Sequence, residues 1–217
     1  MATIHPWLDK HPINQDSKYL IIGTHPPMPY CGKLEYFYGN MSEFWRFLQQ
    51  VYTNEKIYNN GCPNKIDIIS FFNKYSISIT DIVEETDGKP FSVDSDMVIT
   101  KLNTKLKEWL SKSQVNTIYL TSAGGSKSAL SLFKKWLKTN YKGTKTIPNH
   151  KKWIEDGLKI KIEEREYLIE ILYSPSPLAR LGIQGAEPFK NWSKENNNKS
   201  TDDFRIYWYK KKLPKSK

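Results

Sequence analysis

Short apolar runs alternate along the chain with segments whose apolar residues recur every three or four positions. The runs are rich in β-branched and aromatic residues and predict strands, whereas the recurring pattern predicts amphipathic helices. The predicted strands cover residues 18–23, 77–83 and 117–121, and residues 157–173 predict a hairpin. The predicted helices cover residues 42–52, 66–74, 95–111, 127–140 and 201–213. This alternation predicts an α/β fold, with three α/β/α layers around a short, mostly parallel central sheet.

The predicted helix over residues 42–52 begins at Ser42, whose hydroxyl suits an N-cap. Phe44 and Trp45 follow on a strongly apolar helix face. We therefore expect both aromatic side chains to lie in the core.

Two Pro-rich turns, about 150 residues apart, each follow a predicted buried strand. Residues 23–27 read Gly-Thr-His-Pro-Pro, and residues 174–178 read Ser-Pro-Ser-Pro-Leu. Ligands of open α/β sheets bind beyond the carboxyl ends of the strands, where Gly and Pro fix sharp turns. The sequence therefore predicts that the functional site lies between these two turns.

Length and cysteine content narrow the class of protein. At 217 residues and 38% hydrophobic content, the chain suits a single domain over residues 1–217. No stretch approaches the ~20 consecutive apolar residues of a membrane helix, and the first 18 residues lack the apolar run of a signal peptide. Two cysteines, Cys31 and Cys62, are too few for a four-thiolate cluster or a cysteine-rich zinc site. We expect a cytoplasmic monomer without membrane, metal or cofactor.

Positive charge is concentrated in the second half of the chain. Residues 1–100 carry 8 Lys and Arg against 12 Asp and Glu, whereas residues 101–217 carry 25 against 11. Residues 124–161 alone hold ten lysines and only two carboxylates. Such a surface suits a phosphate backbone, although a lysine-rich solvated surface without a nucleic-acid partner explains the same numbers.

The order of several motifs resembles the uracil-DNA glycosylase superfamily. The turn at residues 23–27 is followed by Tyr-Phe-Tyr-Gly-Asn at residues 36–40 and by Glu-Phe-Trp-Arg at residues 43–46. Residues 174–180, Ser-Pro-Ser-Pro-Leu-Ala-Arg, are similar to the second motif of that superfamily. The first spacing resembles the mismatch-specific branch, and residues 79–85 and 91–95 are similar to segments of the hypoxanthine-DNA glycosylase-like branch. The resemblance extends over residues 18–195.

This resemblance implies a DNA glycosylase that flips out a deaminated base, uracil or hypoxanthine, and hydrolyses its N-glycosidic bond with water. It also implies a role for each residue that matches a motif. The implied catalytic residues are His25, Asp81 and Ser174, and the implied base-binding residues are Gly23, Thr24, Phe37 and Asn40, with Phe37 stacking on the base. The implied DNA-binding residues are Ser176, Leu178, Arg180, Ser126 and Lys127, with Leu178 as the apolar wedge that fills the space left by the base.

The chain departs from the superfamily pattern at both catalytic motifs. His25 stands where Asn or Asp usually orients the water, and Ser174 stands where His or Asn usually stabilises the departing base. A neutral His25 could accept a hydrogen bond from water, and a protonated one could stabilise an anionic base. His25, Asp81 and Phe37 each also have a purely structural interpretation. His25 could be a loop histidine that is hydrogen-bonded to the backbone, and Asp81 could cap a helix or form an ion pair. Phe37 could be an ordinary core residue.

Three function classes therefore remain. The first is the glycosylase, and the second is a catalytically altered DNA-binding protein of the same fold. The third is an α/β enzyme for small phosphorylated or nucleoside substrates that binds an anion at Gly124, Gly125 and Ser126. That short segment lacks a Walker or dinucleotide fingerprint.

Overall fold

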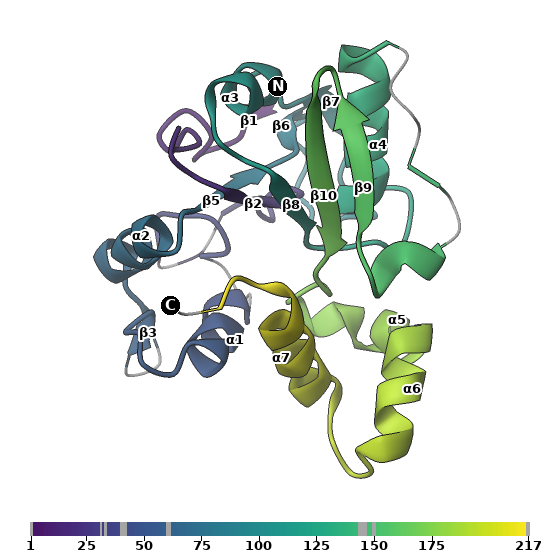
Figure 1. Ribbon diagram of the computed structural model, residues 1–217. Helices are drawn as coiled ribbons and strands as arrows, with labels where there is room; N and C mark the ends of the chain where they lie inside the picture. The colour runs from purple at the N-terminus through teal and green to yellow at the C-terminus, as the bar shows by residue number, and fades with distance from the viewer. Residues whose placement is uncertain are drawn as a thin grey trace.

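A five-stranded sheet forms the centre of the molecule (Figure 1). The computed structural model describes residues 2–30, 32, 34–39, 43–59, 62–142, 147–148 and 151–215. The strand order is β5 (Ile77–Asp81), β2 (Tyr19–Gly23), β8 (Thr117–Leu120), β10 (Arg165–Ile171) and β9 (Leu158–Ile162). The first four strands are parallel, and β9 pairs antiparallel with β10 as the predicted hairpin. The prediction of a short, mostly parallel sheet is confirmed.

The two faces of the sheet bury different apolar clusters. Side chains alternate between the faces of a strand, so Leu20 and Ile22 of β2 enter one cluster and Ile21 enters the other. Ile118 and Tyr119 of β8 divide in the same way. Both faces are apolar, as expected for a parallel sheet covered on two sides.

Helices cover both faces and complete the three layers (Figure 1). The helices α1 (Phe44–Val51) and α2 (Lys65–Lys74) pack with Ile21, and α3 (Leu106–Lys112) and α4 (Ala129–Asn140) pack with Ile22. The last helix, α7 (Thr201–Lys212), contributes to both clusters. Phe44 and Trp45 are buried as predicted. The predicted cap Ser42 lies outside the described residues.

The prediction of one long helix over residues 95–111 is wrong. This segment contains β7 (Ile99–Leu102) and the shorter α3, separated by Asn103. Asn103 accepts hydrogen bonds from the backbone N–H groups of Lys105 and Leu106, an arrangement that favours a helix start over a helix interior. The β-branched residues from Val98 to Thr100 favour a strand instead.

A second sheet forms beside the central one, in the order β1-β6-β7. The strand β1 (Thr3–Ile4) and β7 both pair antiparallel with β6 (Val83–Thr86). The strand predicted over residues 77–83 therefore ends at Asp81, and the chain enters the second sheet two residues later.

Several short elements complete the described chain. The following elements were not predicted from the sequence: the strands β3 (Tyr58–Asn59) and β4 (Cys62–Pro63), the 3-10 helices η1 (Lys151–Ile154) and η2 (Pro177–Ala179), and the helices α5 (Arg180–Gln184) and α6 (Glu187–Glu195). The helix predicted from Lys127 begins at Ala129 instead, because Ser128 is its N-cap. Within the described part of the chain, no helix is long and apolar enough to cross a membrane.

Candidate functional site

The carboxyl ends of β2, β5 and β8 bring polar side chains together. Gly23, the last residue of β2, pairs with Asp81, the last residue of β5. Thr24 and His25 follow Gly23, and Thr121 follows β8. The strand-end cluster is defined by these side chains and three more that the fold adds: Thr24, His25, Asp81, Thr121, His5, Tyr38 and Asp94.

His25 is a buried, neutral histidine. The residue is 5% exposed, and its Nδ1–H donates a hydrogen bond of 2.7 Å to the carbonyl oxygen of Pro26. Burial lowers the pKa of His25 to about 4. Its Nε2 has no hydrogen-bond partner among the described residues. At neutral pH, His25 therefore presents an unpaired acceptor, and the protonated alternative is disfavoured.

Asp81 is 5% exposed and is held on two sides. Its Oδ2 lies 2.8 Å from Nε2 of His5, and its backbone carbonyl accepts a hydrogen bond of 2.9 Å from the amide of Asn103. The ring centroids of His5 and His25 are 4.8 Å apart. The structure thus brings Asp81 and His25 together, with His5 in contact with both.

His5 was not predicted from the sequence. It lies 76 positions from Asp81, directly after a strand of only two residues. So short a strand leaves no periodic pattern, and a single histidine near the start of the chain has no diagnostic spacing.

Gly23 allows the carboxylate and a phenol to approach the backbone closely. A Cβ at this position would lie 2.2 Å from Oδ1 of Asp81 and 2.6 Å from the hydroxyl oxygen of Tyr38. The Tyr38 hydroxyl donates to Oγ1 of Thr121 at 2.8 Å, and burial raises the Tyr38 pKa well above its usual value. Tyr38 is therefore a neutral hydrogen-bond donor that joins the loop at residues 34–39 to the end of β8.

A second carboxylate lies beside the first turn. The Thr24 hydroxyl is 3.1 Å from both carboxylate oxygens of Asp94. Burial raises the Asp94 pKa to about 6, opposed by the bond from Thr24 and assisted by the charge of Asp81. Asp94 belongs to a segment that resembles the superfamily, but sequence reasoning gave it no role.

Phe37 is 1% exposed and forms part of the core. The ring centroids of Phe37 and His5 are 5.6 Å apart. The backbone carbonyl of Phe37 accepts a hydrogen bond from the indole N–H of Trp45. A base could stack on this ring only after the covering residues move. Asn40, the other aromatic-loop candidate, lies outside the described residues.

A buried arginine forms a hydrogen bond with the backbone of the second Pro-rich turn. Arg205 of α7 donates from Nη2 to the carbonyl of Ser176 at 2.8 Å and from Nη1 to Asp202 at 2.7 Å. The Ser176 side chain accepts a bond from the N–H of Leu178, whose side chain is 70% exposed. Arg180 forms a 3.4 Å ion pair with the same Asp202. The turn thus presents an apolar side chain to solvent on a fixed backbone.

Ser174 is not joined to the strand-end cluster. Its hydroxyl accepts a bond from the N–H of Ser176, and no hydrogen bond connects it to His25 or Asp81 among the residues that the structure describes. Ser126 is exposed in the turn after β8. The neighbouring Lys127 donates from Nζ to the carbonyl of Ser95, which ties this turn to the segment that carries Asp94.

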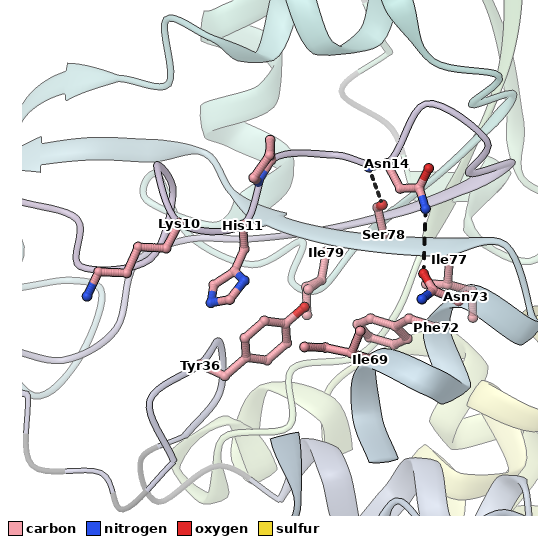
Figure 2. A pocket seen from close by; sticks show the side chains of 11 residues that line it. Lys10, His11, Asn14, Tyr36, Ile69, Phe72, Asn73, Ile77, Ser78 and Ile79 are labelled. Carbon is pink, nitrogen blue, oxygen red and sulfur yellow. Dashed lines mark hydrogen bonds between the residues drawn. The ribbon is translucent and has the colours of Figure 1, made fainter. Parts of the chain in front are cut away.

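A separate cavity of about 190 Å³ lies against β5 and α2 (Figure 2). Tyr36 and His11 face each other at one side of it, and Phe72 lies opposite (Figure 2). Among the described residues, none of the predicted site residues lines this cavity. No group of three or more His, Cys, Asp or Glu in the described chain is arranged to hold a metal ion.

Comparison with solved structures gives a distant likeness. The chain is similar to a solution NMR structure from Methanosarcina acetivorans named a "putative Uracil DNA glycosylase", with 16% sequence identity and a TM-score of 0.47. The match covers 84% of this chain and 90% of that chain. No protein-family model matches the chain. No curated protein matches it either. A likeness this distant carries no conclusion about activity, which rests instead on the residues of the site.

Proposed function

We propose that this protein is a DNA glycosylase that releases a deaminated base, uracil or hypoxanthine, from DNA. One observation carries the proposal: Asp81 and the neutral His25, whose Nε2 has no hydrogen-bond partner among the described residues, both contact His5 at the carboxyl edge of a parallel sheet. Ligands of open α/β sheets bind at this edge. The two Pro-rich turns, which resemble motifs of the uracil-DNA glycosylase superfamily, both leave this edge, because they follow the parallel strands β2 and β10.

The chemistry of base release fits these groups. As the bond between C1′ and the base nitrogen breaks, the sugar becomes positively charged, and a carboxylate such as Asp81 stabilises that charge. Nε2 of His25 accepts a hydrogen bond from the water whose oxygen attacks C1′ and takes up the proton that this water loses, which becomes available to the departing base. The base leaves with the bonding electron pair and is protonated, so that one water is consumed for each base released.

The second turn supplies DNA binding in this proposal. Leu178 enters the duplex in place of the flipped base, and Ser176 and Arg180 contact the neighbouring phosphates. Ser126 and Lys127 bind phosphate from the turn after β8. By the resemblance, the base stacks on Phe37 once the residues that cover this ring move, and Gly23, Thr24 and Ser174 supply further contacts to the base.

The test is base release from duplexes that carry one uracil or one hypoxanthine, detected by alkaline cleavage at the abasic site. His25→Ala is the informative variant, because it removes the acceptor at Nε2 and, unlike Asn, leaves no side-chain group that could orient a water in its place. We expect turnover to fall by about 10²- to 10⁴-fold with DNA affinity retained. Absence of base release by the wild-type protein from every lesion tested would refute the proposal.

A second function has one observation in its favour. Ser174 has no hydrogen bond to the strand-end cluster in the described structure, and His25 is bonded to its own loop. A protein that binds DNA without hydrolysis would tolerate both. It would show salt-dependent DNA affinity and no base release, whereas a His25→Ala variant that loses turnover but keeps DNA affinity excludes it.

A further inference from the structure

His5 is fixed at the strand-end cluster by its backbone and its ring together. The preceding strand β1 pairs with β6, and the His5 N–H donates to the carbonyl of Glu84 at 2.9 Å. The residue is 4% exposed, and its ring borders those of His25 and Phe37. Its position is therefore set by the second sheet rather than by the loop it contacts.

The backbone also selects the tautomer of His5. Nδ1 faces the N–H groups of Trp7 at 3.0 Å and Leu8 at 3.3 Å, so Nδ1 carries a lone pair and accepts from both. The ring proton then lies on Nε2, which donates to Oδ2 of Asp81 at 2.8 Å. A histidine whose tautomer is set by one bond can direct its other nitrogen at a single partner.

The hydrogen bond from His5 determines which carboxylate oxygen of Asp81 is engaged and which is directed toward the end of β2. Oδ2 is engaged by His5, whereas Oδ1 lies over Gly23, at 2.2 Å from where a Cβ would stand. The amide of Asn103 fixes the backbone of Asp81 from the opposite side. The carboxylate therefore has one fixed orientation, with Oδ1 directed toward the end of β2 where Thr24 and His25 begin.

We propose that His5 is a positioning residue for the reaction at this site, because its Nε2–H orients the Asp81 carboxylate toward the substrate. This inference rests on the proposed glycosylase function. His5 itself does not touch the substrate. It acts through Asp81, by holding Oδ1 where it faces the sugar that becomes positively charged.

The activity test compares three substitutions at one position. The side-chain amide of Gln reaches the place of Nε2 and can donate to Asp81, the amide of Asn reaches only the place of Nδ1, and Phe fills the ring volume without a donor. His5→Phe and His5→Asn are expected to lower kcat by about 10- to 100-fold, the effect of removing one hydrogen bond to a charged group, with KM changed by less than about twofold. His5→Gln should recover most of kcat. Equal losses in all three variants, or a full kcat in His5→Phe, would overturn the inference.

A second measurement does not depend on catalysis. Nitrogen-15 NMR of the imidazoles in the wild-type protein should show His5 protonated at Nε2 and not at Nδ1, with an Nε2 proton that exchanges faster with solvent in Asp81→Ala. A proton on Nδ1, or an exchange rate unaffected by Asp81→Ala, contradicts the inference even if the enzyme is active. A wild-type protein that fails to release any base refutes the proposed function instead, while the NMR result still reports on the His5–Asp81 bond.

Discussion

At the scale of single residues, Gly23 is the position where the site tolerates least change. Gly23→Ala would place a methyl group against Asp81 Oδ1 and the Tyr38 hydroxyl, both of which are held by other bonds. We expect the variant to be destabilised by about 1–3 kcal/mol and to lose base release, because Asp81 must turn away from the site. Urea unfolding and the glycosylase assay measure the two effects.

Gly182→Ala is the matched control for this substitution. Gly182 lies in α5, and a Cβ there meets no atom within 4 Å. This variant should gain about 0.5–1 kcal/mol, because Ala is the better helix former. Unchanged stability and activity in Gly23→Ala would show that the Asp81 side chain moves freely.

The buried His25 makes a distinct prediction about acid stability. Its pKa is about 4 in the folded protein, below the usual 6.5, so the unfolded chain binds more protons between these values. The free energy of unfolding contributed by this group therefore falls as the pH drops from 6.5 to 4. We expect the loss between pH 7 and 4.5 to be about 2 kcal/mol smaller in His25→Asn than in the wild-type protein.

Asp94 changes the free energy of unfolding in the opposite direction over a similar pH range. Its pKa of about 6 lies above the usual value for Asp, so its contribution to stability falls as the pH rises from about 4 to 6. Because both proteins contain Asp94, its effect cancels in the comparison. Identical pH profiles for wild type and His25→Asn would mean that His25 titrates normally.

The site residues that could be predicted from the sequence and those that could not lie on different kinds of segment. His25 and Asp81 follow strands with clear apolar patterns, so their meeting at one edge follows from parallel pairing. His5 and Tyr38 reach the same place through a two-residue strand and an irregular loop. Neither segment has a repeat from which its position could be derived.

At the scale of elements, periodicity identified the central strands and the helices that cover them, but it failed where one side chain reorganises the backbone. Residues 95–111 have enough apolar residues for a helix, and Asn103 instead separates a strand from a shorter helix. The Asn103 amide also bonds to the Asp81 carbonyl. The same residue therefore ends the predicted helix and supports the site, a long-range contact that no local pattern encodes.

The link between α7 and the second turn makes another prediction. Arg205→Met keeps much of the side-chain volume over the Phe47 ring but removes the bond to the Ser176 carbonyl. We expect a loss of about 1–3 kcal/mol, because a part-buried carbonyl loses its partner. The N–H of Leu178 should exchange faster with solvent, and affinity for duplex DNA should fall.

Arg180→Met is the control for Arg205→Met, because it also removes one positive charge beside Asp202. The Arg180 side chain is mostly exposed, and such surface pairs contribute less than about 1 kcal/mol. Amide exchange at Leu178 that stays slow in Arg205→Met would show that the turn holds its shape without the arginine.

At the scale of the whole molecule, the proposed function requires DNA to bind at the carboxyl edge of the sheet, and two lysines on either side of β8 test this. Lys127 follows the carboxyl end of β8, and Lys112 ends α3 before its amino end. Lys127→Glu and Lys112→Glu change the net charge of +10 equally, so they separate a local contact from general attraction. We expect the logarithm of DNA affinity to fall linearly with the logarithm of salt concentration. The slope should be about 1 unit shallower in Lys127→Glu, because one phosphate contact is lost. It should be unchanged in Lys112→Glu. Fluorescence anisotropy with a labelled duplex between 50 and 200 mM salt measures these slopes. Equal slopes in the two variants would mean that DNA is attracted by the overall charge and does not contact the turn after β8.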